Sequence, residues 1–203
     1  MYALAASAAG VGVLALAQPA EAKIVYTKTH KVLQQMGDSV NIDLNHDGVR
    51  DFAVAIGCVG WDSCVPTLRA YKFSNWIMMT ASGAVAALPS GAYIGKQEGG
   101  ARPLKTFSWG YPMLACGSRH AGGPWLDVKD RYLGLRFQIK GKAHYGWARL
   151  NASAQPPYQI RATLTGYAYE TVPGKGIIAG QTKGPDVITV QSGSLGSLAL
   201  GRK

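Results

Sequence analysis

The residues with the clearest capacity for chemistry lie in the stretch DLNHDGVRDFAV, residues 43–54. If Asp43 is position 1, oxygen-bearing side chains recur at positions 3, 5 and 9, and a backbone carbonyl is available at position 7. These positions are Asn45, Asp47, Asp51 and, for the carbonyl, Val49. Calcium takes six to eight oxygen ligands, and a tight loop with oxygens at alternate positions turns them toward one point. The spacing therefore predicts a structural calcium site.

The structural alternative to a metal site is an Asp/Asn-rich turn without a metal, since both residue types favour turns. A turn needs one or two such residues rather than four at alternate positions. An EF-hand is excluded because position 12 is Val54 instead of a glutamate and because the flanking segments are strand-like. His46 and Arg50 fall at non-ligand positions and are expected to face water.

This nonapeptide resembles the calcium loop of FG-GAP repeats, the integrin-propeller type, with its pattern D-x-[DN]-x-D-G-x-x-D. The resemblance implies side-chain ligation by Asp43, Asn45, Asp47 and Asp51 and carbonyl ligation by Val49. Those repeats occur in series around a propeller, whereas this sequence carries the pattern once. The resemblance therefore covers the loop chemistry and not the propeller fold.

Catalytic motifs are missing from the sequence. The nucleophile elbow G-x-S-x-G is absent, and Ser118 stands beside His120 without a recognisable orienting acid. Cys116 and His120 could form a catalytic Cys–His pair, but no other motif in the sequence supports this assignment. No motif pairs two carboxylates outside the loop as a glycosidase requires. We therefore expect a non-catalytic protein. A secreted hydrolase without a recognised motif is the least favoured of three interpretations.

Aromatic residues suggest a carbohydrate-binding, lectin-like module as the second interpretation. Aromatic rings stack against sugar faces, and the chain has five tryptophans and ten tyrosines. Alternation in YQIRATLTGYAYE places Tyr167 and Tyr169 on the polar face of a strand, where they would be exposed ligand-face aromatics. The alternative for Tyr145 and Trp147 is burial in the core, because large aromatics usually pack.

The elements that must position these residues are short strands. Apolar residues alternate with polar ones in RYLGLRFQIKGKAHYGWARL, which predicts a hairpin that turns at residues 140–142. No segment beyond residue 22 shows helical periodicity over three turns. The sequence thus predicts an all-β protein, an antiparallel two-sheet sandwich of jelly-roll-like type, with a closed β-barrel as the alternative.

The chain of 203 residues divides into three expected parts. Residues 1–22 contain a short apolar run and end in Ala20-Glu21-Ala22, which is typical of a signal peptide, although a basic n-region is absent. Residues 23–181 are expected to form the sandwich domain and residues 182–203 a flexible C-terminal tail. Two interpretations of the tail stay open: a truncated sorting or anchor segment, or the end of a released protein. That tail is too short to span a bilayer, so we expect no transmembrane span in the mature chain.

Export allows the three cysteines to form one disulfide. Cys58 and Cys64 enclose only five residues and are the favoured pair, and Cys116 with either of them is the alternative. The calcium loop, the N-terminal AASAAGVGVLALA and the segments YLGLRFQIKGKAHYGWARL and LTGYAYETVPGKGIIAG resemble exported bacterial proteins of unknown function. Some of those proteins carry PEP-CTERM-like sorting tails. The resemblance implies an extracellular, cell-surface or periplasmic single-domain β protein and brings no activity.

A formal net charge of +10 favours anionic partners such as a cell-surface polymer or glycan. The basic residues are scattered, and no nucleic-acid recognition motif accompanies them, so we expect no nucleic-acid partner. The sequence predicts no oligomeric state. It predicts an exported, non-catalytic β-sandwich stabilised by one calcium ion, with an unknown partner.

Overall fold

The computed structural model describes residues 23–59, 65–72, 75–80, 83–96 and 111–184. Every regular element in these ranges is a β-strand, which confirms the all-β prediction. The first sheet has the order β1 (Ile24–Leu33), β11 (Gln159–Glu170), β10 (Lys142–Gln155), β9 (Val128–Ile139) and β5 (Trp76–Ile77). The second has the order β2 (Ser39–Ile42), β3 (Phe52–Val59), β4 (Val65–Lys72), β7 (Tyr111–Cys116) and β8 (Ala121–Gly122).

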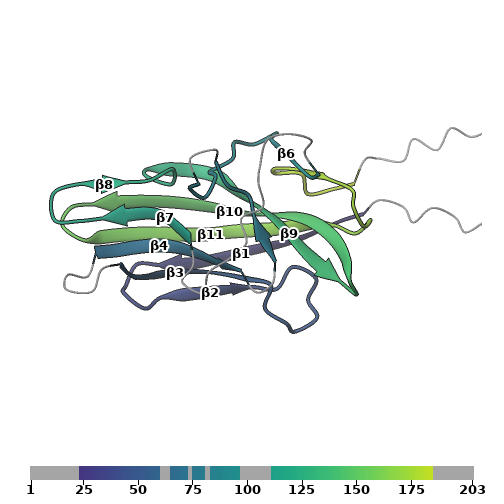
Figure 1. The fold of residues 1–203 in the computed structure, drawn as a ribbon, viewed down its shortest axis with the longest axis horizontal. Helices are drawn as coiled ribbons and strands as arrows, with labels where there is room; N and C mark the ends of the chain where they lie inside the picture. The colour runs from purple at the N-terminus through teal and green to yellow at the C-terminus, as the bar shows by residue number, and fades with distance from the viewer. Residues whose placement is uncertain (1–22, 60–64, 73–74, 81–82, 97–110, 185–203) are drawn as a thin grey trace, which may run out of the picture.

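The two sheets are antiparallel throughout and do not close into a barrel, which confirms the sandwich (Figure 1). Most neighbouring strands are consecutive in sequence, as in β9–β10–β11 and β2–β3–β4. Both sheets are therefore largely meanders rather than the interleaved Greek keys of a jelly roll. Three pairings in these sheets join strands that are not consecutive in sequence, β1–β11, β4–β7 and β5–β9, and the first of them joins the earliest and the last strand of the first sheet.

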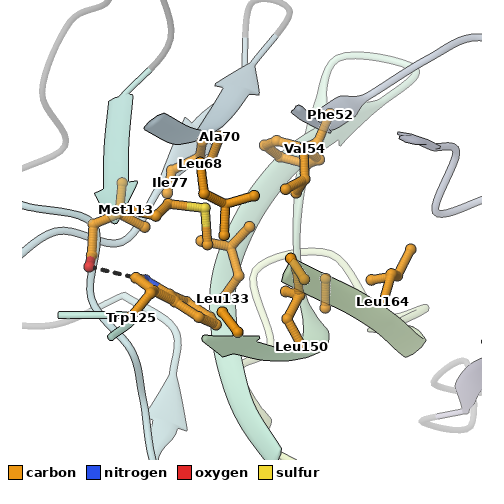
Figure 2. Packing of buried hydrophobic residues seen from close by; sticks show 14 of the residues in the cluster. Phe52, Val54, Leu68, Ala70, Ile77, Met113, Trp125, Leu133, Leu150 and Leu164 are labelled. Carbon is orange, nitrogen blue, oxygen red and sulfur yellow. Dashed lines mark hydrogen bonds between the residues drawn. The ribbon is translucent and has the colours of Figure 1, made fainter. Parts of the chain in front are cut away.

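The main core lies between the inner faces of the two sheets (Figure 2). Each strand contributes the apolar half of an alternating pattern, because successive side chains point to opposite faces. Burying a Val, Leu, Ile, Phe or Met side chain stabilises the fold by about 1.5 to 3 kcal/mol. Trp125 is completely buried beside this core, and its indole N–H donates to the carbonyl of Val85 at 3.2 Å. The core residues labelled in Figure 2 are Phe52, Val54, Leu68, Ala70, Ile77, Met113, Trp125, Leu133, Leu150 and Leu164.

The predicted hairpin is confirmed as β9 and β10, joined at Lys140 and Gly141. Both turn residues have positive φ, 49° and 76°, as a type I′ turn requires. The turn matches the right-handed twist of the strands, so it needs only these two residues. On β9 the predicted apolar face, Leu133, Leu135 and Phe137, is buried.

The prediction that Tyr167 and Tyr169 lie on an exposed face is wrong. The register against β10 shifts between Leu164 and Gly166, so Thr165 is an extra residue, a β-bulge. The bulge moves the following side chains by one position. Tyr169 is therefore only 9% exposed in the main core, and Tyr167 is half-buried against it.

Thr165 also satisfies the backbone that the bulge leaves unpaired. Its hydroxyl donates to the carbonyl of Arg149 at 3.2 Å and accepts the Nε–H of the same arginine at 2.8 Å. A strictly alternating pattern has no place for such a residue. The physical reason for the error is therefore a local bulge and not a wrong assignment of the strand.

A second, smaller core covers the other face of the first sheet. Trp147 is completely buried there, with its ring centroid 5.1 Å from that of Tyr132 in an edge-on arrangement. The short pair β6 (Tyr93–Ile94) and β12 (Ile177–Ile178) adds two isoleucines over this face (Figure 1). The alternative prediction of core positions for Tyr145 and Trp147 is confirmed, since Tyr145 is 8% exposed.

Candidate functional site: the Asp43–Asp51 loop

The Asp43–Asp51 loop joins β2 to β3 at one end of the sandwich (Figure 1). Its two ends are fixed by the sheet, because Ile42 pairs with Phe52 and the amide of Asp51 donates to the carbonyl of Ile42 at 3.0 Å. Leu44 is buried and ties the start of the loop to the core. The strands VNI and FAVAI therefore hold the ends of the loop as the sequence predicts.

Within the loop, carboxylates accept hydrogen bonds from the loop's own backbone. Asp43 accepts the amides of Asp47 at 3.3 Å and Gly48 at 2.9 Å. Asp47 accepts the amide of Val49 at 2.8 Å. Gly48 has φ of 83°, a conformation that glycine adopts without a steric penalty. These bonds fold the chain tightly around the acidic side chains.

Asp51 is the buried member of the set, 8% exposed. One carboxylate oxygen accepts the amide of Leu44 at 2.9 Å, across the mouth of the loop. Asn75, a buried residue just before β5, donates its side-chain amide to the Asp51 carbonyl at 3.2 Å and to the other carboxylate oxygen at 3.4 Å. Sequence spacing does not indicate that Asn75 supports this loop, because the contact spans 24 residues.

Asn45 leaves one acceptor unused. Its side-chain N–H donates to Asp47 at 2.9 Å, while its Oδ1 is buried and has no hydrogen-bond donor among the described residues. A buried acceptor without a partner costs about 1 to 3 kcal/mol. This oxygen belongs to one of the five predicted ligands, so a cation is the partner that the pattern predicts for it.

Asp51 is affected by the charges of the two other aspartates of the loop. Burial raises the pKa of Asp51 above its usual value, and the charges of Asp43 and Asp47 raise it further, against a lowering effect of the Leu44 amide. Asp47 is fully exposed, and hydrogen bonds from Asn45 and from the Val49 amide lower its pKa. A cation near Asp51 would relieve the repulsion from Asp43 and Asp47.

His46, a loop residue outside the predicted ligand set, contacts Thr27 on β1 and Tyr167 on β11. The His46 imidazole lies 2.7 Å from the Thr27 hydroxyl, and its ring centroid is 6.0 Å from that of Tyr167. Burial raises the pKa of Tyr167, hydrogen bonding to Thr27 lowers it, and the charge of Asp43 raises it. The expectation that His46 simply faces water omitted these contacts, although its side chain is exposed.

Among the described residues, no three His, Cys, Asp or Glu side chains are grouped as they would be around a metal ion. The carboxylates of Asp43, Asp47 and Asp51 accept hydrogen bonds from backbone amides. Val49, the predicted carbonyl ligand, is 64% exposed. The calcium assignment for Asp43, Asn45, Asp47, Val49 and Asp51 thus stays a prediction.

The structure describes two of the three cysteines, Cys58 and Cys116. Cys116 is a free thiol, completely buried, so its pairing with either other cysteine is wrong. Cys58 has an interaction partner and is not a free thiol. Cys64, its predicted disulfide partner, lies outside the described residues. The Cys58–Cys64 pair therefore stays a prediction. His120, proposed as a partner for Cys116, lies exposed on the turn that follows β7, whereas the thiol faces the interior.

A buried polar pair that the sequence did not indicate lies where β10 begins and β11 ends. His144 places Nδ1 3.0 Å from the Glu170 carbonyl, and the Glu170 carboxylate accepts the Val172 amide at 3.0 Å and meets Lys175 at 3.4 Å. Both His144 and Glu170 are buried. Each polar group in these contacts has a partner, as is typical of a buried cluster that stabilises the fold.

Comparison of the chain with protein-family models, with curated proteins and with solved structures gives no match. Within the described ranges, no helix is long and apolar enough to cross a membrane.

Proposed function

We propose that this chain is an exported, non-catalytic β-sandwich protein in which the Asp43–Asp51 loop binds one structural calcium ion. The buried, unpartnered Oδ1 of Asn45 is the single observation that carries the proposal. The residue sits at a ligand position of a pattern that supplies three carboxylates and a carbonyl besides. Calcium converts an unfavourable buried acceptor into a ligand.

Electrostatics supports a cation rather than an empty turn. Asp43 and Asp47 both raise the pKa of Asp51, so the ionised loop is destabilised by its own charge. A divalent ion at the centre reverses the sign of these interactions. The loop amides need not be released for this to occur, because each carboxylate oxygen has a second lone pair.

Export fits the chemistry of a single loop without a bidentate glutamate. Calcium modules that work outside cells bind with dissociation constants of about 10⁻⁴ to 10⁻³ M. A loop with one ligand-rich turn and an exposed Val49 belongs at this weak end of the range. The signal-like pattern of residues 1–22 supports export, and calcium is abundant outside cells.

The proposal is tested by thermal unfolding and by calorimetric titration with CaCl₂. Calcium at about one hundred times Kd should stabilise the fold by about 2.7 kcal/mol relative to EDTA. Asp47→Ala should remove this response. Asp38→Ala is the matched control, because Asp38 also accepts two backbone amides, those of Gln34 and Gln35, but lies in a different turn.

The control variant should lose some stability and keep the full calcium response. Equal melting temperatures of the unaltered chain in calcium and in EDTA, together with no heat of binding, would rule the calcium site out. A calcium response that persists in Asp47→Ala would move the site elsewhere.

A further inference from the structure

The β10–β11 hairpin and the turn that follows β1 lie at the end of the sandwich opposite the Asp43–Asp51 loop (Figure 1). Residues of both segments line a partly open cavity of about 530 Å³. It forms where the β10–β11 hairpin extends beside the turn that follows β1, and its size is typical of small-molecule sites. We name it the glutamine pocket after its principal lining residues, Gln34, Gln35, Gln155, Gln159, Tyr158 and Arg161. Sequence separation hides it, since residues 34 and 161 meet only through the β1–β11 pairing.

The strands place the polar side chains of the glutamine pocket in register. Gln155 pairs with Gln159, and Ser153 pairs with Arg161 across the hairpin, and all four are exposed. The Arg161 guanidinium donates to the side-chain oxygen of Gln34 at 3.3 Å, which links β11 to the end of β1. Strand pairing therefore sets the positions of the lining residues that β10 and β11 contribute.

Tyr158 is held in an unusual conformation at the edge of the glutamine pocket. Its φ is 61°, a left-handed value that costs a bulky residue energy, yet its side chain is 50% exposed. Its amide donates to the carbonyl of Gly117 at 3.2 Å, which fixes the turn against the second sheet. A strained, anchored and solvent-exposed aromatic ring is more typical of a ligand contact than of packing.

The chemistry of this lining selects a class of ligand. Carboxamides both donate and accept hydrogen bonds, as sugar hydroxyls do, and four of them converge here. The exposed ring offers a flat face for a pyranose. Arg161 is the one charged residue in the described lining, and guanidinium recognises carboxylates through paired N–H donors.

We propose that the glutamine pocket binds a saccharide that carries a carboxylate. Tyr158 lies against a sugar ring, the glutamine amides bind its hydroxyls, and Arg161 binds its carboxylate. The absence of any acidic residue from the described lining suits an anionic ligand, as does the net charge of +10. This site is separate from the calcium loop and does not depend on it.

Calorimetric titration with three acidic hexasaccharides provides the test: hyaluronan, glucuronoxylan and galacturonan fragments. Each is paired with the same hexasaccharide after reduction of its carboxylates to alcohols. At least one acidic form should bind, and its reduced partner should bind about tenfold more weakly. Measurements in calcium and in EDTA should agree, because the Asp43–Asp51 loop is not involved.

Tyr158→Gly is the decisive variant. Glycine adopts the left-handed φ readily, so the melting temperature should stay constant or rise while affinity falls about tenfold or more. Tyr158→Phe keeps the ring and should retain most of the affinity. Arg161→Gln should lose the preference for the acidic form. Tyr93→Ala removes another exposed tyrosine, on β6, and should leave binding unchanged.

Lys142→Gln removes an exposed charge at the far end of β10 and is the control for Arg161→Gln. The assignment is overturned if none of the three acidic hexasaccharides binds. Equal affinity for acidic and reduced forms also overturns it, as does undiminished binding by Tyr158→Gly.

Discussion

The Asp43–Asp51 loop and the glutamine pocket lie at opposite ends of the sandwich and differ in the polar groups that they gather (Figure 1). The loop collects carboxylates and turns them onto its own amides. The glutamine pocket collects carboxamides around one guanidinium. Like charges at close range favour a counter-ion, whereas neutral amides remain available to a ligand with both donors and acceptors.

The two regions also differ in how the chain builds them. Nine consecutive residues supply the proposed calcium ligands, and the flanking strands need only hold the ends. The glutamine pocket draws on two segments more than one hundred residues apart, joined at the Gln34–Arg161 contact. Local sites can therefore be inferred from spacing, and composite sites require the topology.

The largest expected effect comes from Asp51→Ala. In EDTA it should destabilise the fold by about 1 to 3 kcal/mol, because the buried amide of Leu44 loses its acceptor. In calcium at about one hundred times Kd, a further ~2.7 kcal/mol of stabilisation should be lost. Urea unfolding in both buffers measures the two contributions.

Asp51→Asn separates charge from hydrogen bonding. The amide oxygen can still accept from Leu44, so the loss in EDTA should be small, while the calcium response should shrink. Equal losses in EDTA for the Ala and Asn variants would show that packing, and not the hydrogen bond, governs this position.

Two tyrosines on β11 provide a pH test of the loop. Burial is the main cause that raises the pKa of both Tyr167 and Tyr169, and Asp43 adds to the rise only for Tyr167. In the folded protein the pKa values of both tyrosines exceed the usual 10.0. The stability that depends on the two tyrosines being neutral is therefore fully present below pH 10.0 and is lost as pH rises through the folded values. Calcium should lower the pKa of Tyr167 and leave that of Tyr169 unchanged.

Tyrosinate absorbance in Tyr167→Phe and Tyr169→Phe assigns the two titrations. A calcium-induced shift in Tyr169, or none in Tyr167, would mean that the ion does not bind near Asp43.

Glycine substitutions at two left-handed residues have a smaller expected effect. Lys140, φ 49°, and Tyr158, φ 61°, should each gain up to about 1 kcal/mol of stability as glycine, since the steric penalty at Cβ disappears. Only Tyr158→Gly should lose saccharide binding. If neither variant is stabilised in thermal unfolding, strain is not stored at these turns.

The smallest expected effect is the coupling between the two ends. Asp47→Ala and Tyr158→Gly are distant and share no described partner, so their effects on the free energy of unfolding should add to within about 0.3 to 0.5 kcal/mol. A double-mutant cycle in calcium measures the remainder. A larger coupling would mean that the loop and the glutamine pocket act as one unit.

Much of the fold followed from local pattern. Alternation in β9 and β10 predicted the hairpin, and Gly141 predicted the position of its turn, because side-chain period and turn geometry are set by neighbouring residues. The faces of Tyr167 and Tyr169 were predicted wrongly because Thr165 forms a bulge, which depends on the partner strands. Pairing, and not propensity, decides where an extra residue is accommodated.

By itself, the sequence determined the strand class, the hairpin and the spacing of oxygens in the Asp43–Asp51 loop, since each depends on residues within a few positions of one another. Only the tertiary structure decided that Asn75 supports Asp51 and that Gln34 meets Arg161 beside Tyr158. Those contacts arise when strands distant in sequence pair and bury their apolar faces. Burial drives that pairing, and it leaves no mark on the spacing of the polar residues that it brings together.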